Sequence, residues 1–247
     1  MKTISSRTNE TVKRIVALHQ KKQRTAHGQF IAEGLRTCST LIESGVTLLQ
    51  LFITEQHLQA AQELTQDENI TLVDESVMQK MSTASTPSGI IGQFAIPESP
   101  SAHTLSSGLV LAQVSDPGNM GTLIRTAAAL NKKTVMIIGG TDPYSPKVVQ
   151  SSAGTIGMVN IFQWEWHELL ENKGKNQLIA LVVSDGKNPS ELTAKNALLV
   201  VGSEAHGIPE QWISDCNDTL TLPMFGSTES LNAAVAGSIA LYLCTVQ

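Results

Sequence analysis

Polar side chains gather in three loops, each of which follows an apolar run of the sequence. The loops lie in the segments DPGNMGTLIRTAAAL (116–130), LLVVGSEAHGIPE (198–210) and LTLPMFGSTESLNAAVAGSIALY (220–242). Arg125 comes six residues after Asn119, near the expected start of a helix, where a guanidinium can point at a phosphate or hydroxyl oxygen. Glu204 in the second loop can accept a proton or orient Arg125. The loops therefore contain groups suited to a reaction at a hydroxyl.

The usual nucleotide-binding fingerprints are missing from these loops. GSEAHGI at 202–208 has two glycines at P-loop spacing, but Ile208 stands where the phosphate-binding lysine must be. No GxGxxG follows an expected strand, and neither HExxH nor GxSxG occurs. The absence of these motifs excludes a P-loop and argues against a dinucleotide-dependent enzyme.

The three cysteines do not form a metal-binding pattern. Cys38, Cys216 and Cys244 occur at unrelated spacings, without the CxxC pairs or clustered histidines of a zinc site. We therefore expect buried free thiols and no metal.

The second half of the chain alternates apolar strands with glycine-containing loops. LVLAQV (109–114), TVMIIGG, QLIALVVSDG and ALLVVGSEAHG are apolar runs typical of strands buried in a parallel sheet. Helical patterns run from about Met120 to Leu130 and from about Ser230 to Cys244. The pattern predicts an α/β domain with a parallel sheet, and ligands bind such sheets at the carboxyl ends of the strands.

The first half predicts a smaller α/β unit. QFIAEG, LLQLFIT, NITLVD and GIIGQFAI are expected strands, separated by helical patterns at 35–44, 55–64 and 75–82. Before them, the spacing predicts one amphipathic basic helix from Asn9 to Lys22. The Ser- and Pro-rich stretch after Ile96 predicts a linker, so we expect domains over 1–97 and 109–247, joined by 98–108.

Charge is unevenly distributed along the 247 residues. Residues 1–36 carry a net charge of +6 and the rest carry −11. A basic end on an acidic body suggests an anionic partner, although a solvated basic helix has the same composition. The polar start and the absence of an apolar run of about 18 residues predict a cytoplasmic protein with no membrane span.

The three loop segments resemble, in order, the signature motifs of the SpoU, or TrmH-like, family of RNA 2'-O-ribose methyltransferases. The segment SRTNETVKRIVALHQKKQRTAHGQFIAEGLR is similar to the substrate-binding domain of ribosomal-RNA members. The resemblance implies an α/β fold of the SPOUT superfamily, with a parallel sheet and a trefoil knot, plus a small N-terminal α/β (L30e-like) domain. It also implies a homodimer packed through the knotted domains, with S-adenosylmethionine as the cofactor.

The resemblance assigns roles residue by residue. The residues expected in catalysis are Asn119, Arg125, Glu204, Ser230 and Asn232. Those expected around the cofactor are Val183, Ser184, Gly202, Leu222, Met224 and Leu231. The charge of residues 1–36, and not the resemblance, selects the basic residues expected to contact RNA, which are Arg7, Lys13, Arg14, Lys21, Lys22, Arg24 and Arg36. The chain departs from the family in the third motif, with Ala233 for the common Val and Ala234 for the usual Ser, and we expect neither change to remove activity.

Four of the expected catalytic residues, and His206 in the second loop, also have a purely structural interpretation. Arg125 can be a surface or salt-bridge residue, and Glu204 can cap a short helix at 208–213. Asn232 can be a local cap, Ser230 can be a plain N-cap, and His206 can be an ordinary loop residue.

The resemblance implies an S-adenosylmethionine-dependent RNA 2'-O-ribose methyltransferase. Because compact transfer-RNA members largely lack the N-terminal domain, we expect ribosomal RNA as the substrate. The alternatives are a transfer-RNA 2'-O-methyltransferase and a non-catalytic RNA-binding or ribosome-assembly protein on the same fold. Methyl transfer in vitro would exclude the non-catalytic alternative.

Overall fold

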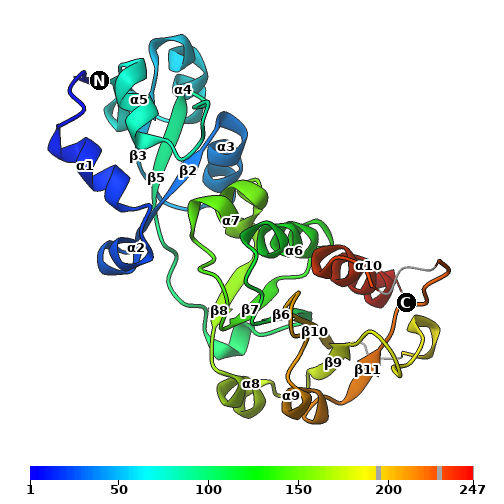
Figure 1. Cartoon of the computed structure of the whole chain (residues 1–247). Coiled ribbons are helices and arrows are strands. Elements are labelled where there is room, and N and C mark those ends of the chain that lie inside the picture. Colours follow the sequence, from blue (N-terminus) through cyan, green and yellow to red (C-terminus); the bar gives the residue numbers. More distant parts are fainter. Residues whose placement is uncertain (193–195, 227–229, 247) are drawn as a thin grey trace. The chain divides into compact units, whose positions relative to one another are not determined.

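The computed structural model describes residues 1–192, 196–226 and 230–246, so residues 227–229 of the third loop segment lie outside the described residues. Contacts divide the chain into two compact units. The first comprises Met1–Glu98 and Asp142–Gly157, and the second comprises Ser99–Thr141 and Met158–Gln247. Each unit contains its own sheet (Figure 1).

The first unit contains a mixed five-stranded sheet with the order β1-β4-β3-β5-β2. β1, β4 and β3 run parallel, whereas β5 is antiparallel to both β3 and β2. The strands are β1 (Lys2–Ile4), β2 (Gln29–Glu33), β3 (Leu48–Ile53), β4 (Ile70–Val73) and β5 (Ile90–Ala95). The four strands predicted in this half are confirmed, and the three-residue β1 is too short to show a periodicity.

The helices of the first unit also follow the predicted pattern for the most part. They are α1 (Glu10–Ala17), α2 (Lys21–His27), α3 (Leu35–Glu43), α4 (Leu58–Leu64), α5 (Glu75–Met81) and α7 (Pro146–Ser151), with the short η1 (Glu55–His57) and η2 (Asp67–Asn69). The short η4 (Thr155–Met158) follows α7.

The prediction of one basic helix over Asn9–Lys22 is wrong, because the helix breaks between α1 and α2. Gln20 has extended backbone angles, with φ −95° and ψ 132°. Arg24 stabilises the break, since its Nη1 donates to the carbonyl oxygens of Leu18 and His19, both at 2.8 Å. Carbonyl groups at a helix end need such partners because the helix itself supplies none.

Residues 142–157 complete the first unit, although the sequence-based division counts them within 109–247. Arg24 is 3% exposed, and its Nε and Nη2 donate to Asp142 Oδ2 at 2.8 and 2.5 Å. The Tyr144 ring lies 5.2 Å from that of Phe30. A Cβ at Gly154, which has φ +82°, would lie 2.5 Å from the Thr37 carbonyl oxygen. This segment therefore packs into the core of the first unit.

The second unit contains a six-stranded parallel sheet with the order β11-β9-β10-β6-β7-β8. All neighbouring strands in it run parallel, which confirms the predicted parallel sheet. The strands are β6 (Gly108–Ala112), β7 (Thr134–Ile138), β8 (Asn160–Gln163), β9 (Gln177–Leu181), β10 (Ala197–Gly202) and β11 (Asp218–Leu220). The sequence did not predict the edge strands β8 and β11, which are short.

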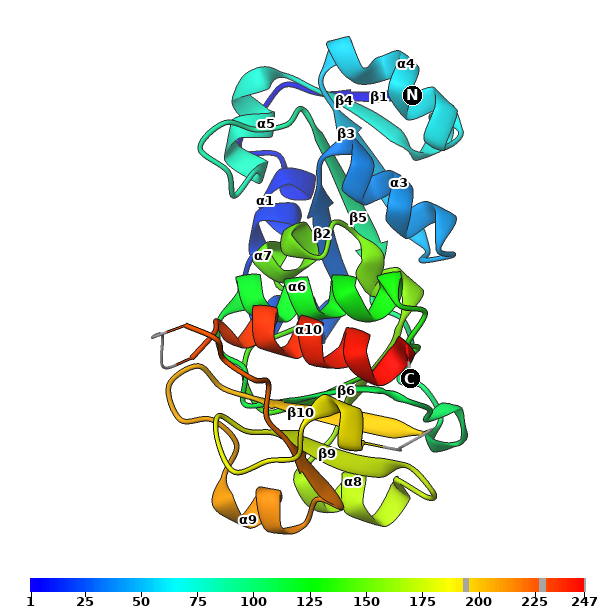
Figure 2. The same cartoon turned by 90° about the vertical axis from the view of Figure 1, so that its right-hand side faces the viewer.

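Helices cover both faces of this sheet. They are α6 (Pro117–Ala129), α8 (Trp166–Asn172), α9 (Glu210–Ser214) and α10 (Ala233–Val246), with the short η3 (Ala102–Thr104) and η5 (Pro189–Glu191). α6 and α10 lie side by side on one face, and α8 and α9 lie on the other (Figures 1 and 2). On the side of α8 and α9, the rings of Trp166 and Trp212 stack with their centroids 4.7 Å apart.

The last helix begins at Ala233, three residues later than predicted. Its packing on α6 is close at Gly237, where a Cβ would lie 2.7 Å from Leu123 Cδ2. Within the described residues, none of the helices is both long and apolar enough to cross a membrane.

Candidate functional site

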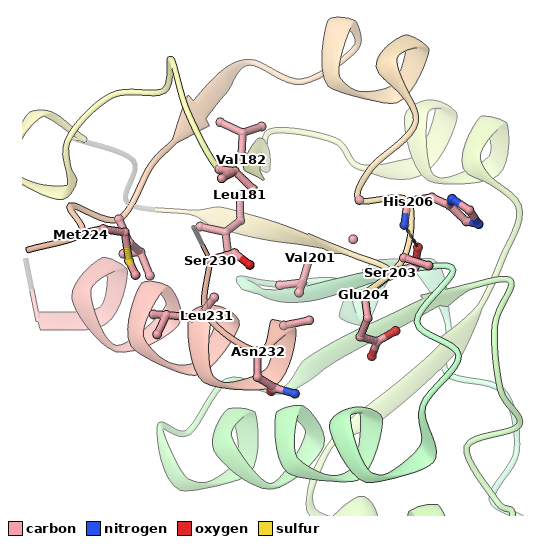
Figure 3. A pocket seen from close by; sticks show the side chains of 17 residues that line it. Leu181, Val182, Val201, Ser203, Glu204, His206, Met224, Ser230, Leu231 and Asn232 are labelled. Carbon is pink, nitrogen blue, oxygen red and sulfur yellow. Dashed lines mark hydrogen bonds between the residues drawn. The ribbon is translucent and has the colours of Figure 1, made fainter. Parts of the chain in front are cut away.

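A pocket of about 660 Å³ opens at the carboxyl ends of β9, β10 and β11, next to the start of α10 (Figure 3). Its volume is within the usual range for small-molecule sites, and its position is the usual one in a parallel sheet. Its lining comprises Leu181, Val182, Val183, Val201, Gly202, Ser203, Glu204, Ala205, His206, Gly207, Leu222, Met224, Ser230, Leu231, Asn232, Ala233 and Ala236.

Three of the expected catalytic residues, one from each loop segment, form a hydrogen-bonded chain beside this pocket. Asn119 Nδ2 donates to Glu204 Oε1 at 2.6 Å, and Asn232 Nδ2 donates to Asn119 Oδ1 at 3.0 Å. Glu204 and Asn232 line the pocket, whereas Asn119 is not part of the lining and joins the two. The Asn119 amide therefore orients the Glu204 carboxylate.

Helix caps hold the two asparagines in place. Asp116 Oδ1 accepts a hydrogen bond from the Asn119 backbone N–H at 2.8 Å and so caps α6. Asn232 Oδ1 accepts from the backbone N–H groups of Ala234 and Val235, at 2.9 and 3.2 Å, at the start of α10. Asn232 is thus a helix cap and a member of the hydrogen-bonded chain at once, because its oxygen serves the first role and its nitrogen the second.

A tight hairpin presents Glu204. The backbone N–H groups of Ser203 and Gly207 each donate to the other residue's carbonyl oxygen, at 3.1 and 2.9 Å. Gly202 allows the hairpin to fold back, since a Cβ there would lie 2.3 Å from the Gly207 carbonyl carbon and 2.5 Å from the Ile208 nitrogen. The interpretation of Glu204 as a helix cap is wrong: α9 begins at Glu210, and the Glu204 carboxylate binds Asn119.

Most of the residues expected around the cofactor line this pocket. Its apolar lining includes four of them, and Gly202 contributes backbone. The four are Val183, Leu222, Met224 and Leu231. Ser184 lies outside the lining, and its hydroxyl donates to Asp185 Oδ2 at 2.8 Å.

Two residues that also had a purely structural interpretation line the pocket, and other lining residues were not predicted. Ser230 lines the pocket but is not the N-cap of α10, because that helix begins at Ala233. His206 also lines the pocket, and its backbone N–H donates to Ser203 Oγ at 3.2 Å. Sequence reasoning missed Ser203 and Val201 as lining residues, and their only signal is that they flank Gly202.

Arg125 is exposed on α6 and does not line the pocket. The salt bridges among the described residues do not involve it, so the salt-bridge interpretation finds no partner there. The next residue, Thr126, contacts Ser238 of α10 with 2.8 Å between the hydroxyl oxygens. Arg125 therefore presents an exposed guanidinium on α6, and contact with α10 holds that helix in place.

The basic residues of the first unit divide into two groups. Arg24 is buried and bonded to Asp142, so its expected role in RNA binding is wrong. The others are exposed, namely Arg7, Lys13, Arg14, Lys21, Lys22 and Arg36.

The cysteines are poorly suited to chemistry at neutral pH. Burial raises the pKa of the Cys38 thiol to about 12, and burial likewise raises that of Cys216 to about 12. Groups of three His, Cys, Asp or Glu side chains that could hold a metal do not occur among the described residues.

Two family models match the chain. The SpoU rRNA Methylase family matches residues 107–242, which include all three loop segments, and the MRM3-like substrate binding domain matches residues 9–92. The chain belongs to the SpoU rRNA methylase family. The predicted family, the α/β fold and the assignment as an RNA methyltransferase are thereby confirmed.

Relatives of this SpoU methylase extend over nearly its whole length. It is 30% identical to an "uncharacterized tRNA/rRNA methyltransferase slr1673" of Synechocystis, over 97% of this chain and 92% of the relative. It is 28% identical to the "23S rRNA (guanosine(2553)-2'-O)-methyltransferase RlmP" of Bacillus subtilis, over 98% of both chains. The crystal structure of an AdoMet-bound rRNA methyltransferase from Sinorhizobium meliloti matches with a TM-score of 0.87 and 27% identity, over 98% of this chain and 97% of that one.

Proposed function

We propose that this protein transfers a methyl group from S-adenosylmethionine to a ribose 2'-hydroxyl of ribosomal RNA. The observation that carries the proposal is the hydrogen-bonded chain Glu204–Asn119–Asn232, which joins the three loop segments at one pocket of a SpoU methylase. Relatives named as 23S rRNA 2'-O-methyltransferases and the match to a substrate-binding domain favour ribosomal RNA over transfer RNA.

The pocket fits the proposed cofactor. Val183, Leu222 and Leu231 offer apolar surface to an adenine ring, and the backbone at Gly202 lines the pocket beside them. Once bound, S-adenosylmethionine supplies a methyl group on a positively charged sulfur. AdoMet-bound structures are known for two similar proteins, the rRNA methyltransferase from Sinorhizobium meliloti and AviRb from Streptomyces viridochromogenes.

The protein's own residues then align the hydroxyl and handle its proton. Holding two reactants at attack distance contributes about 7–11 kcal/mol to lowering a barrier of this kind. We assign Glu204 as the group that accepts the hydroxyl proton, because its carboxylate lines the pocket and Asn119 orients it. We assign Arg125 to orienting the substrate and stabilising negative charge, since a guanidinium is a poor base but a strong hydrogen-bond donor. Ser230 at the pocket is the expected substrate contact.

We further propose that the exposed basic residues of the first unit bind RNA phosphates. Lys13, Lys21 and Lys22 represent this group on α1 and α2. Binding through phosphates releases counterions, so RNA affinity should fall steeply as salt rises. In this division residues 1–97 bind substrate, 98–108 connect and 109–247 carry out methyl transfer, apart from the segment 142–157, which packs with the first unit.

A homodimer packed through the second unit is also part of the proposal. α10 carries a stripe of large apolar side chains on one face, with exposures of 41–59%. The stripe comprises Val235, Ile239, Tyr242 and Val246, at helical spacing. Covering it with a second copy would remove this apolar surface from water. The trefoil knot, which the family resemblance implies, and a cytoplasmic location complete the proposal.

The decisive experiment combines cofactor binding with methyl transfer by the full chain. S-adenosylmethionine should raise the melting temperature while NAD does not, because a ligand stabilises only the state that binds it. The protein should then transfer tritiated methyl groups to unmethylated ribosomal RNA, at a 2'-hydroxyl detectable by resistance to alkaline cleavage.

A pair of variants tests the site. Glu204→Gln should abolish most of the transfer, whereas Glu210→Gln, a matched change of an exposed Glu on α9, should not. Cofactor binding without transfer to any RNA would instead favour the non-catalytic RNA-binding alternative. Transfer to transfer RNA alone would correct the substrate.

A further inference from the structure

Phe225 differs from every other phenylalanine in the chain in its exposure to solvent. The chain has five phenylalanines, and Phe30, Phe52, Phe94 and Phe162 are at most 1% exposed. Phe225 is 99% exposed. A phenyl ring held fully in water gains nothing for the fold, because apolar surface stabilises a protein only when it is buried. The ring of Phe225 is therefore available to a partner outside the chain.

The position of Phe225 limits which partner reaches it. It lies in the loop that connects β11 to α10, and two neighbours, Leu222 and Met224, line the pocket. Figure 3 labels Met224 at the pocket. Phe225 itself does not line the pocket. A small molecule that fills the pocket would cover Leu222 and Met224 but would leave the phenyl ring in water.

The loop itself indicates what kind of contact the ring makes. Residues 221–226 read TLPMFG and carry no charged side chain, so the segment around Phe225 has no cation of its own to attract a phosphate. A phenyl ring has no hydrogen-bonding group, and its flat π face is suited to stacking on another flat ring. The bases of single-stranded RNA offer such faces, whereas bases inside a duplex are already stacked.

A second copy of the chain has a separate surface to cover. The exposed stripe on α10 begins at Val235, within the helix, and Phe225 lies outside that helix in the preceding loop. A nucleotide whose ribose enters the pocket must, in contrast, carry its base and its neighbours past the pocket rim. This argument rests on the proposed function, which places the substrate ribose at the pocket.

We propose that Phe225 stacks on an unpaired base of the RNA strand whose ribose is methylated. The contact positions the strand at the pocket rim and is tolerant of base identity, because every base has a π face. Phe225 is thus an RNA-binding residue of the second unit, separate from the basic residues of the first.

The test measures RNA binding by the full-length protein, with fluorescence anisotropy of a fluorescein-labelled single-stranded RNA of mixed sequence and of the same sequence as a duplex. Phe225→Ala removes the ring, Phe225→Trp keeps an aromatic face, and Phe225→Leu keeps apolar bulk only. Met158→Ala is the matched control, since Met158 is 39% exposed in the second unit and does not line the pocket. Calorimetry with S-adenosylmethionine and sedimentation velocity accompany each variant.

Stacking predicts a specific set of results. Phe225→Ala and Phe225→Leu should weaken single-strand binding by about 5- to 150-fold, the range for one stacked base. Phe225→Trp should bind like the parent, and duplex affinity, cofactor affinity and oligomeric state should stay unchanged in all variants.

Several results would overturn the proposal. These are parent-like single-strand binding by Phe225→Ala or Phe225→Leu, no single-strand binding by the parent itself, or a shift of Phe225→Ala toward monomer, which would assign the ring to a contact between copies. Failure of the proposed function is distinguishable, because it appears as a parent that neither binds S-adenosylmethionine nor methylates ribosomal RNA, whatever the Phe225 variants do.

Discussion

Both the nitrogen and the oxygen of the Asn119 side-chain amide form hydrogen bonds, so a substitution that removes one of them tests the role of this residue. Its nitrogen donates to Glu204, and its oxygen accepts from Asn232. Asn119→Asp keeps the shape but replaces the donor with a second carboxylate oxygen beside Glu204. A hydrogen bond to a charged group contributes about 1.5–3 kcal/mol, so single-turnover methylation should fall about 10- to 150-fold. The exposed Asn172→Asp on α8 is the control, and equal rates for both variants would contradict the assignment.

Arg125 should act on substrate and not on cofactor, since it is exposed on α6 outside the pocket lining. Arg125→Ala should lower turnover by about 100- to 1000-fold, as loss of one preorganised donor typically does. S-adenosylmethionine affinity measured by calorimetry should stay within several-fold of the parent. Arg125→Lys should restore little, because a point charge does not replace a planar fork of donors. Near-normal methylation by Arg125→Ala would remove the residue from the mechanism.

His19 makes the stability of the protein depend on pH. Burial lowers the pKa of His19, and its Nε2 donates to the Met81 carbonyl oxygen at 2.9 Å in the neutral form. The stability from this neutral ring is fully present above the unfolded-state pKa of about 6.5. Below it the unfolded chain binds a proton that the folded chain resists, so the free energy of unfolding decreases as pH falls toward the folded-state pKa.

Urea denaturation across about pH 5–8 measures this dependence. His19→Gln keeps a donor for Met81 and should flatten the pH profile in this range. The exposed His167→Gln should leave the profile unchanged. An unaltered slope in His19→Gln would assign the dependence to other groups.

The junction of β10 and the Ser203–Gly207 hairpin is the element on which the pocket depends most. A Cβ at Gly202 would meet backbone atoms at 2.3 and 2.5 Å, and backbone cannot move aside as a flexible side chain can. Gly202→Ala should destabilise the protein by about 1–3 kcal/mol and weaken S-adenosylmethionine binding at least tenfold. Gly226→Ala is the matched control, because a Cβ there meets nothing within 4 Å. Cofactor affinity equal to the parent in Gly202→Ala would show that the hairpin tolerates the shift.

At the scale of the whole molecule, the first unit depends on residues that come late in the chain. Tyr144 is 6% exposed, and Val148 and Val149 are fully buried, within the segment 142–157 that folds with residues 1–98. A fragment of residues 99–247 would expose these side chains to water. We therefore expect it to aggregate during analytical gel filtration, because large exposed apolar patches promote association.

A matched variant separates this effect from a general failure to fold. The same fragment with Tyr144→Ser, Val148→Ser and Val149→Ser should elute as a defined species and bind S-adenosylmethionine, since the pocket residues lie outside 142–157. In the full chain these three substitutions should lower the melting temperature. A fragment that is soluble without them would contradict the role of this segment.

The sequence by itself determined the features that depend on local residue order. Apolar runs of five or six residues predicted the central strands of the second sheet, because a strand buried on both faces must be apolar throughout. The three loop segments predicted the family, since the chemistry needs particular side chains at particular spacings. The same local patterns missed the short strands β8 and β11 and the break between α1 and α2.

Only the tertiary structure decided the features that depend on contacts between distant residues. Asn119 meets Glu204 and Asn232 across 85 and 113 positions of sequence, and no spacing pattern encodes such a meeting. Arg24 has the composition of a surface cation, yet Asp142, 118 positions away, holds it buried. The reason is physical: periodicity reports which face of an element is apolar, whereas the partner of a polar side chain is chosen by the packing of the whole chain.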